Sequence, residues 1–326
     1  MLNNLFKKKV YVHEAIDAFV DRMIINNKGI SEVTKNTTVR RFRAIKSAID
    51  KDMIVKDFNY IVVEQIIRQW QERGLNGSTI KSRMGEIKRM CHYWFMIGLV
   101  EKQIPLMKLP MTPRKKVVVY EEKDYINIIN ALRKEMYEAS WNFGQIYSQR
   151  GLLAEKVYIS IRVLYETGLR PTEFNRLKWS DVDEFSNTIT IRRFSDRKGD
   201  DRTIPVSGKL MTELMQYKGT LGRIYLSPWY KEHLSQEYIQ QNFYVAFNKI
   251  MKKHNVQLPG NEYKIRRFRG TFATRAINRG VSSEFLARYL GHSNTTTIKY
   301  YASSKSILNN RKSDIRKLKA MQIFKK

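Results

Sequence analysis

A basic, proline-containing segment about a third of the way along the chain most constrains the fold. Residues 105–116 hold three prolines and four cationic side chains. Proline cannot continue a helix, because it lacks the N–H donor and its ring clashes with the preceding turn. Since helical patterns lie on both sides, we interpret the segment as an extended interdomain linker; the alternative is a long surface loop within one domain. We place the first domain at 1–108, the linker at 109–116 and the second domain at 117–326.

Apolar residues of the first domain recur at helical spacing. Ala15, Phe19 and Met23 are four residues apart and predict one face of a helix. We expect three further helices, at residues 36–50, 57–73 and 80–98. The apolar side chains expected to face the core in the first two of them are Val39, Phe42, Ile45, Ile49, Ile61, Ile66 and Trp70.

The second domain changes from helical to alternating patterns and back again. Residues 157–166 are almost wholly apolar and predict a buried helix, whereas 188–192 alternates and predicts a strand. A turn at 198–201 leads to a second predicted strand, 202–206. The apolar positions of the flanking predicted helices are Tyr125, Ile128, Ile129, Leu132, Phe243, Phe247 and Ile250. The predicted fold class is therefore mainly α with a small antiparallel β-sheet.

The charge balance points to a polyanionic partner. Sixty Lys and Arg face 31 Asp and Glu, which gives a formal net charge of +29. Such an excess repels itself in the folded state, so nucleic acid is the first candidate and an anionic membrane surface the second. There is no run of about 18 apolar residues that would span a membrane. Residues 1–10 lack the apolar core of a signal peptide, which fits a cytoplasmic protein.

Cysteine and histidine usage argues against disulfide and metal chemistry. Cys91 is the single cysteine, and its apolar and aromatic neighbours favour a buried thiol over a reactive one. The five histidines are scattered, with no pair at metal-ligand spacing. We therefore expect neither a metal site nor a cofactor.

The run Thr167-Gly168-Leu169-Arg170-Pro171-Thr172-Glu173 is the first candidate for chemistry. Gly168 can end the buried helix in a left-handed cap, and Pro171 suits the first turn of the next helix. Arg170 would then sit at a helix N-terminus, where free N–H groups and a guanidinium both attract anions. The alternative is an ordinary helical turn with a solvated arginine.

Two further basic features lie downstream. Lys198 lies in the predicted strand–turn–strand, where a turn can carry a lysine toward a DNA groove, although lysines are common in turns. Arg266 and Arg269 are three residues apart on an expected helix, so they share a side and could clamp one phosphate. The core face of that helix is predicted to hold Phe268, Phe272 and Ala276. A basic face along a DNA backbone without chemistry is the alternative.

Leu290-Gly291-His292 precedes a candidate nucleophile. Gly291 should end a helix, with His292 at the break, and Tyr301 follows nine residues later on a short Thr-rich helix. Tyrosine is a poor nucleophile at its ordinary pKa of about 10. Arginines around a phosphate and a nearby proton acceptor would make its attack feasible.

Taken in order, these features resemble the tyrosine recombinase (phage integrase) family. Its pattern is an arginine in a T-G-x-R turn with a nearby acidic residue, a hairpin lysine, a His-x-x-Arg helix, and L-G-H with a tyrosine nine residues after that histidine. The matching residues here are Arg170, Glu173, Lys198, Arg269, His292 and Tyr301. The resemblance also covers 78–109, which is similar to the end of the family's helical (SAM-like) core-binding domain, and 117–326, which is similar to its catalytic domain.

Arg266 departs from the pattern, because the family has a histidine there. Arginine stays charged and cannot act as a general base, so Arg266 could stabilise phosphate or tyrosinate charge while His292 or a water accepts the proton. The shifted register Lys264-x-x-Arg267 would restore a titratable residue, but it would put the arginine out of register with residues 270–274. Tyr300 adjoins Tyr301 and would point about 100° away on a helix, so we assign it a packing role.

The resemblance implies two domains that clamp duplex DNA as a homo-tetramer. Tyr301 would form a 3′-phosphotyrosyl intermediate, Arg170, Arg269, His292 and Arg266 would stabilise the phosphate, and Lys198 would protonate the leaving oxygen. The helical tail 302–326 packs either on its own domain or, as in this family, on a neighbouring protomer. Since only about ten residues precede the first expected helix, we expect no separate arm-binding domain.

The predicted function is site-specific DNA recombination through Holliday junctions, for integration and excision or transposition of a mobile element. A type IB topoisomerase would share the chemistry but act without site specificity. A non-enzymatic DNA-binding regulator would explain the charge but not the ordered set of residues.

Overall fold

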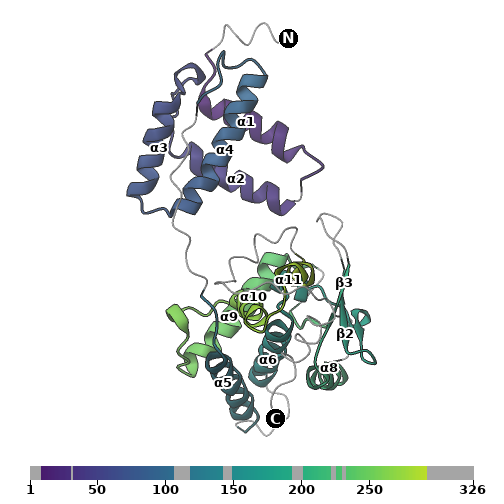
Figure 1. The fold of residues 1–326 in the computed structure, drawn as a ribbon. Helices are drawn as coiled ribbons and strands as arrows, with labels where there is room; N and C mark the ends of the chain where they lie inside the picture. The colour runs from purple at the N-terminus through teal and green to yellow at the C-terminus, as the bar shows by residue number, and fades with distance from the viewer. Residues whose placement is uncertain are drawn as a thin grey trace. The chain divides into compact units, whose positions relative to one another are not determined.

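Helices dominate the computed structural model, which describes residues 9–30, 32–105, 118–141, 149–192, 201–221, 225–229 and 233–291 (Figure 1). The chain divides into two units, Met1–Lys115 and Lys116–Lys326. The predicted linker, 109–116, lies outside the described residues. Among the helices that are described, none is both long and apolar enough to cross a membrane.

The first unit is helical throughout its described residues. Its elements are α1 (Val12–Val20), the π-helical turn η2 (Asp21–Ile25), α2 (Glu32–Lys46), the 3-10 turn η3 (Val55–Asp57), α3 (Tyr60–Glu72) and α4 (Gly77–Met96). Its core is centred on the fully buried side chains of Ile16, Phe42, Ile45, Trp70 and Trp94. Cys91 belongs to this core, which confirms the prediction that it is buried, and burial raises the pKa of its thiol to about 12.

Two apolar positions predicted for this core are exposed. Met23 is 41% exposed, because the wider π turn η2 shifts the helix phase by one residue and buries Ile24 in its place. Ile61 is 49% exposed, because it follows the cap of α3, where the Asn59 side chain accepts the N–H of Ile61 at 2.9 Å. The buried face of α3 instead holds Val63, Ile66, Ile67 and Trp70.

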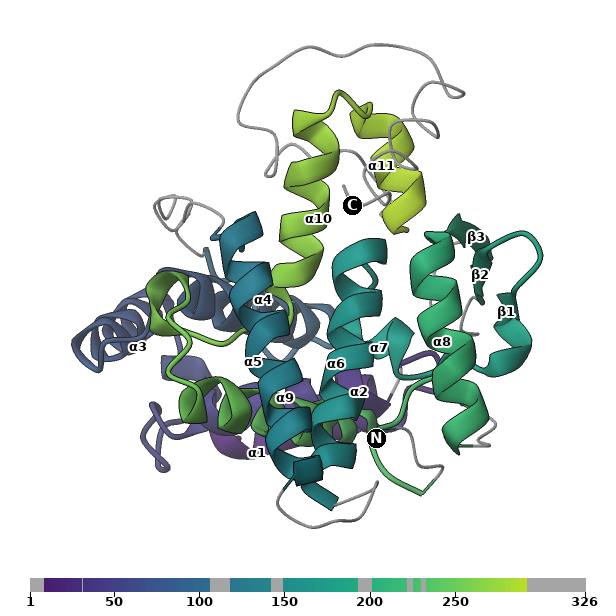
Figure 2. The same cartoon turned by 90° about the horizontal axis from the view of Figure 1, so that it is seen from below.

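The second unit surrounds a central helix. Its helices are α5 (Glu122–Trp141), α6 (Gln149–Thr167), α7 (Pro171–Phe174), η4 (Trp179–Asp181), α8 (Gly208–Leu221), α9 (Gln236–Lys253), η5 (Pro259–Asn261), α10 (Arg267–Asn278) and α11 (Ser283–Leu290). α6 contacts α5, α7, α8, α9 and α10, and α10 contacts α11 (Figure 2). The apolar run 157–166 lies in α6 and is almost wholly buried, as predicted.

The sheet of the second unit is antiparallel, with the order β1 (Val182–Asp183), β2 (Thr188–Ile191) and β3 (Arg202–Pro205). Ile189 pairs with Ile204, and both are buried. The two predicted strands are confirmed to within one residue at their ends. β1 escaped prediction because two residues are too short to display alternation. The turn with Lys198, within 193–200, lies outside the described residues.

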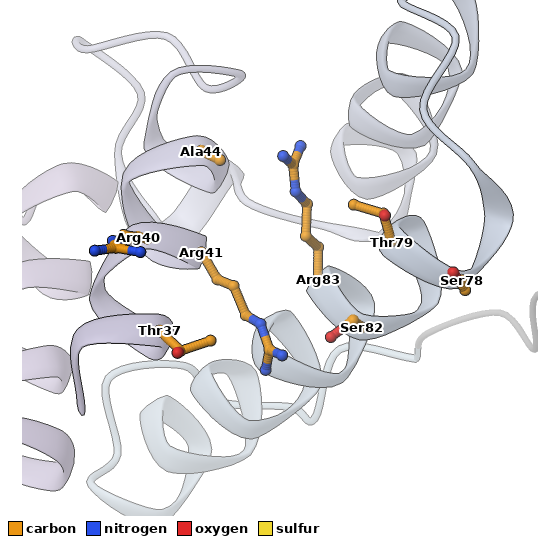
Figure 3. A pocket seen from close by; sticks show the side chains of 8 residues that line it. All are labelled: Thr37, Arg40, Arg41, Ala44, Ser78, Thr79, Ser82 and Arg83. Carbon is orange, nitrogen blue, oxygen red and sulfur yellow. The ribbon is translucent and has the colours of Figure 1, made fainter. Parts of the chain in front are cut away.

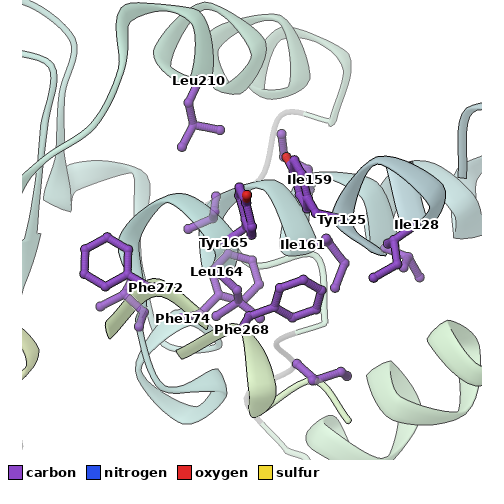
Figure 4. Close-up of a cluster of buried hydrophobic side chains, with 14 of the residues drawn as sticks. Tyr125, Ile128, Ile159, Ile161, Leu164, Tyr165, Phe174, Leu210, Phe268 and Phe272 are labelled. Carbon is purple, nitrogen blue, oxygen red and sulfur yellow. The ribbon is translucent and has the colours of Figure 1, made fainter. Parts of the chain in front are cut away.

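Aromatic side chains fill the core between α5, α6 and α10 (Figure 4). The Tyr125 and Tyr165 rings stack with centroids 3.5 Å apart, and Phe268 meets Tyr165 edge-on at 6.4 Å. Phe268, Phe272 and Ala276 are 0% exposed, which confirms the predicted core face of α10. This packing fixes the helix that carries Arg269.

Phe268→Ala should therefore lower the stability of the second unit. Removing a fully buried aromatic ring leaves a cavity, and we expect a loss of about 3–5 kcal/mol in the free energy of unfolding. Urea denaturation measures this loss. The matched control is Phe185→Ala, since Phe185 is 100% exposed and its loss should cost less than about 0.5 kcal/mol. Equal effects of the two variants would contradict the assigned core.

Candidate active site

Arg170 lies at a sharp turn between α6 and α7. α6 ends at Thr167, and Gly168 follows with φ +65°. A Cβ at Gly168 would lie 2.5 Å from the Phe272 ring, so this position requires glycine both for its backbone angle and for its lack of a side chain. Pro171 begins α7, as predicted. The turn therefore places Arg170 at the N-terminus of α7.

Glu173 is held among three arginines. Its Oε2 accepts the backbone N–H of Arg170 at 2.9 Å, and its Oε1 accepts the side-chain Nη1 at 2.8 Å. Oε2 also lies 3.0 Å from Nη2 of Arg202 and 3.8 Å from Nη1 of Arg269. Burial alone would raise the pKa of this carboxyl, but the charges of Arg202, Arg269 and Arg170 hold the pKa below its ordinary value. Glu173 is therefore an ionised anchor for guanidiniums.

Arg269 is buried beneath the same turn. It is 8% exposed, and its Nη1 donates to the Gly168 carbonyl at 2.9 Å. Its Nη2 donates to the Leu290 carbonyl at 2.6 Å. One side chain of α10 thus joins the end of α6 to the end of α11.

The C-terminus of α11 closes this cluster. Gly291 has φ +65°, which turns the chain out of the helix as the sequence predicts. Nη1 of Arg170 donates to the Leu290 carbonyl and Nη2 to the Gly291 carbonyl, both at 3.4 Å. Unpaired carbonyls and the negative end of the helix dipole favour cations here. Arg170 and Arg269 consequently meet at the Leu290 carbonyl, two residues before His292 in the sequence.

Arg202 was missed as a site residue. It starts β3, is 17% exposed as a side chain, and its Nε donates to the Tyr289 carbonyl at 2.8 Å. Strand parity could have revealed it, because residues two apart share a face of a sheet. Ile204 was predicted in the same strand and is buried, so Arg202 points to the interior as well.

Arg266 and Arg267 differ in their surroundings. Arg266 caps α10 and is exposed, and the described residues offer it no ion pair. Arg267 donates to the Glu262 carboxylate at 2.7 Å and lies 5.7 Å from the Tyr120 ring centroid. Arg267 thus braces the segment before α10, and Arg269 is the arginine of this helix that reaches Arg170 and Glu173.

The remaining predicted site residues, Lys198, His292, Tyr300, Tyr301 and the tail 302–326, lie outside the described residues. Their roles stay predictions. The described geometry brings together Arg170, Glu173 and Arg269 and carries the chain to the residue before His292.

A separate acidic group was not anticipated from the scattered histidines. Ligand atoms of Glu135, Glu138 and His254 lie within 4.8 Å of one another. Lys253 pairs with Glu135 at 2.5 Å and with Glu138 at 3.0 Å, and Arg150 also pairs with both. These two cations neutralise the carboxylates that a metal ion would need. The group is best described as an ion-pair network that joins α5, α6 and α9.

The first unit carries a basic hollow between α2 and α4 (Figure 3). Its volume is about 380 Å³, and its lining residues are Thr37, Arg40, Arg41, Ala44, Ser78, Thr79, Ser82 and Arg83. Arg41 pairs with Glu86 at 2.9 Å, and Arg83 lies 4.9 Å from the Trp70 ring centroid, so both side chains are braced from outside the hollow. Guanidiniums, hydroxyls and the N-terminus of α4 together suit an anion.

Comparison with known proteins places the chain in a family. The Phage integrase family profile matches residues 134–306, more than half of the chain. The chain therefore belongs to the phage integrase family, the class of tyrosine recombinases. The tyrosine recombinase XerA of Pyrococcus furiosus is 26% identical over 143 residues, 43% of this chain and 48% of that protein. XerA of Pyrococcus horikoshii is 26% identical over 231 residues, 69% and 70% of the two chains.

These relatives are matched over part of their length, about half for the first. Solved structures share the fold more fully. A lambda integrase dimer bound to a COC′ core site has a TM-score of 0.69 at 14% identity, covering 94% of this chain and 82% of that chain. A lambda integrase tetramer bound to a Holliday junction has 0.66 at 14%, covering 93% and 81%. The Tn1549 transposon integrase in complex with a circular intermediate DNA has 0.68 at 16%, covering 91% and 96%.

The anchoring role of Glu173 predicts a pH-dependent contribution to stability. Because its pKa is lowered in the folded protein, the ionised carboxyl stabilises the fold above the ordinary glutamate pKa of about 4.3. That contribution is lost as the pH falls through the lower folded value. Wild type should exceed Glu173→Gln in unfolding free energy at pH 7, and the gap should close below about pH 4.

Urea denaturation from pH 7 to pH 3 measures the gap. Glu184→Gln is the matched control, because Glu184 is exposed in the turn between β1 and β2 and should show almost no gap at any pH. A gap for Glu173→Gln that stays constant down to pH 3 would contradict the anchoring role.

Proposed function

We propose that this chain is a site-specific DNA recombinase that cleaves and rejoins DNA through Tyr301. The observation that carries the proposal is the meeting of Arg170 and Arg269 at the Leu290 carbonyl, directly before Gly291 and His292. Two guanidiniums fixed in advance can bind the phosphoryl oxygens on which charge develops, without reorganising during the reaction. The family match supports the same reading.

The proposed reaction is a transesterification. The Tyr301 oxygen bonds to the scissile phosphorus while the bond to the 5′-oxygen breaks, which leaves a 3′-phosphotyrosyl link and a free 5′-hydroxyl. Arg170, Arg269 and His292, with help from Arg266, stabilise the phosphoryl charge. His292 or a water takes the proton from the Tyr301 hydroxyl, and Lys198 donates a proton to the leaving oxygen. Attack by a 5′-hydroxyl reverses the step, so no external energy source is consumed.

The wider assembly is also part of the proposal. The two units would clamp duplex DNA, and four protomers would exchange strands through a Holliday junction, with the tail 302–326 packed on a neighbour. The solved lambda integrase tetramer on a Holliday junction supports this arrangement. Integration and excision or transposition of a mobile element is the proposed role, in line with the likeness to lambda and Tn1549 integrases.

Tyr301→Phe should abolish covalent attachment to DNA. The substrate is a nicked duplex carrying the recombination site, located first by footprinting, from which the cleaved end diffuses away. Wild type and Tyr300→Phe should both become attached, as a shifted band on a denaturing gel, whereas Tyr301→Phe should not. Attachment that survives in Tyr301→Phe and disappears in Tyr300→Phe would overturn the assignment. Relaxation of a supercoiled plasmid without any site would favour a topoisomerase instead.

We propose further that the hollow of the first unit binds a DNA backbone phosphate. Arg40 is exposed there, and no hydrogen bond or ion pair within the described residues occupies it. Its loss should remove one phosphate contact, so Arg40→Ala should reduce the slope of log affinity against log salt by about 0.9. Fluorescence anisotropy with duplex DNA at several salt concentrations measures the slope.

Arg22→Ala is the matched control for that measurement. Arg22 is also an exposed arginine of the first unit, but it does not line the hollow, so the slope should not change. Equal slopes for Arg40→Ala and wild type would remove the hollow from the DNA interface.

A further inference from the structure

Arg202 links three elements of the second unit through one guanidinium. It begins β3, its Nη2 lies 3.0 Å from Oε2 of Glu173, and its Nε donates to the Tyr289 carbonyl at 2.8 Å. A Cβ at Gly291 would lie 2.8 Å from its Nη1. The sheet, the start of α7 and the last turn of α11 therefore converge on this side chain.

In the sequence, Arg202 lies close to one predicted site residue, and the backbone that it contacts lies next to another. Lys198 precedes Arg202 by four residues in the sequence. At the other end, His292 directly follows Gly291. One guanidinium thus fixes the strand that leads out of the Lys198 turn against the backbone that leads into His292.

Arg202 shares the Glu173 carboxylate with Arg170 and Arg269. Without Arg202, the other two arginines keep that carboxylate, so the guanidiniums that face the phosphate stay anchored. What is lost is the link from the start of β3 to Glu173 and to the Tyr289 carbonyl.

We propose that Arg202 is a positioning residue that sets the Lys198 turn and the His292 backbone relative to the Arg170–Glu173–Arg269 cluster. The inference rests on the proposed recombinase function and adds a residue that was not among the predicted site residues. We assign Arg202 no contact with the reacting atoms. It acts through the placement of Lys198, so its loss should resemble the loss of the leaving-group acid.

Two DNA substrates distinguish a misplaced proton donor, Lys198, from a general loss of activity. In the first, the scissile phosphate has its ordinary 5′-oxygen, which must take a proton as it leaves. In the second, a 5′-sulfur replaces that oxygen. The phosphorus–sulfur bond breaks to give a thiolate, and a thiol with a pKa of about 8.5 needs no proton donor to leave at pH 8. The rate of covalent protein–DNA complex formation is measured with both.

Arg202→Ala should slow complex formation with the ordinary substrate about 10- to 100-fold, as a displacement of a catalytic group by about 1 Å would. The 5′-sulfur substrate should restore most of that loss, as it should for Lys198→Ala. The rate of Arg170→Ala should not be restored, because Arg170 stabilises the charge on the phosphoryl oxygens. Equal slowing of Arg202→Ala on both substrates, or a wild-type rate on the ordinary one, would overturn the inference.

Arg192→Ala is the matched control. Arg192 follows β2 on the other side of the same turn, but it is 62% exposed and pairs with Asp181 rather than with Glu173. Its loss should change the rate less than about twofold, because an exposed ion pair outside the site contributes little. If wild type attaches to neither substrate, the proposed function fails, which is distinct from failure of the positioning role.

Arg202→Lys keeps the test usable if the alanine variant does not fold. Lysine retains the charge near Glu173 but lacks the rigid fork that reaches Glu173 and the Tyr289 carbonyl together. Its rate should fall between those of wild type and Arg202→Ala, with the same recovery on the 5′-sulfur substrate. A wild-type rate for Arg202→Lys on the ordinary substrate would reduce Arg202 to a charge-balancing role and overturn the inference.

Discussion

The second unit depends on one part-buried carboxylate. Glu173 accepts from the backbone and side chain of Arg170 and lies within ion-pair distance of Arg202 and Arg269. These partners come from the N-cap of α7, from β3 and from α10, and all three also donate to the carbonyls that end α11. Buried like charges would repel one another, so three guanidiniums can share this space only because an anion and several carbonyls surround them. The carboxylate therefore sets where the positive charge of the site is held.

Much of this arrangement follows from the sequence where local rules decide it. The helix face with Tyr125 and Leu132, the αL glycines at 168 and 291, and the pairing of Ile189 with Ile204 depend on periodicity, backbone angle and strand parity. Met23 and Ile61 were placed wrongly because a π turn and a helix cap shift the phase by amounts that spacing alone does not show. Arg202 escaped because its partners, Glu173 and Tyr289, are 29 and 87 residues away in the sequence.

The two units use positive charge differently. In the first, the hollow between α2 and α4 leaves Arg40 open to solvent, where attraction to a polyanion is strong at long range and weakened by salt. In the second, Arg269 is buried, and the exclusion of water strengthens its short-range contacts. The net charge of +29 is therefore a poor guide to the site itself, because the cluster around Glu173 holds only three of the sixty basic side chains.

The acceptors that end the cluster are main-chain carbonyls of residues 289, 290 and 291. A carbonyl is supplied by every amino acid, so the side chains at 289 and 290 can change without removing a hydrogen bond from any of the three arginines. Only the course of the backbone is fixed, and Gly291 alone carries that requirement in its identity. The side chains of α11 are thus constrained by packing in the core and not by the hydrogen bonds of the site. The polar information that specifies the site is held in one glycine and in the arginines that donate to this backbone.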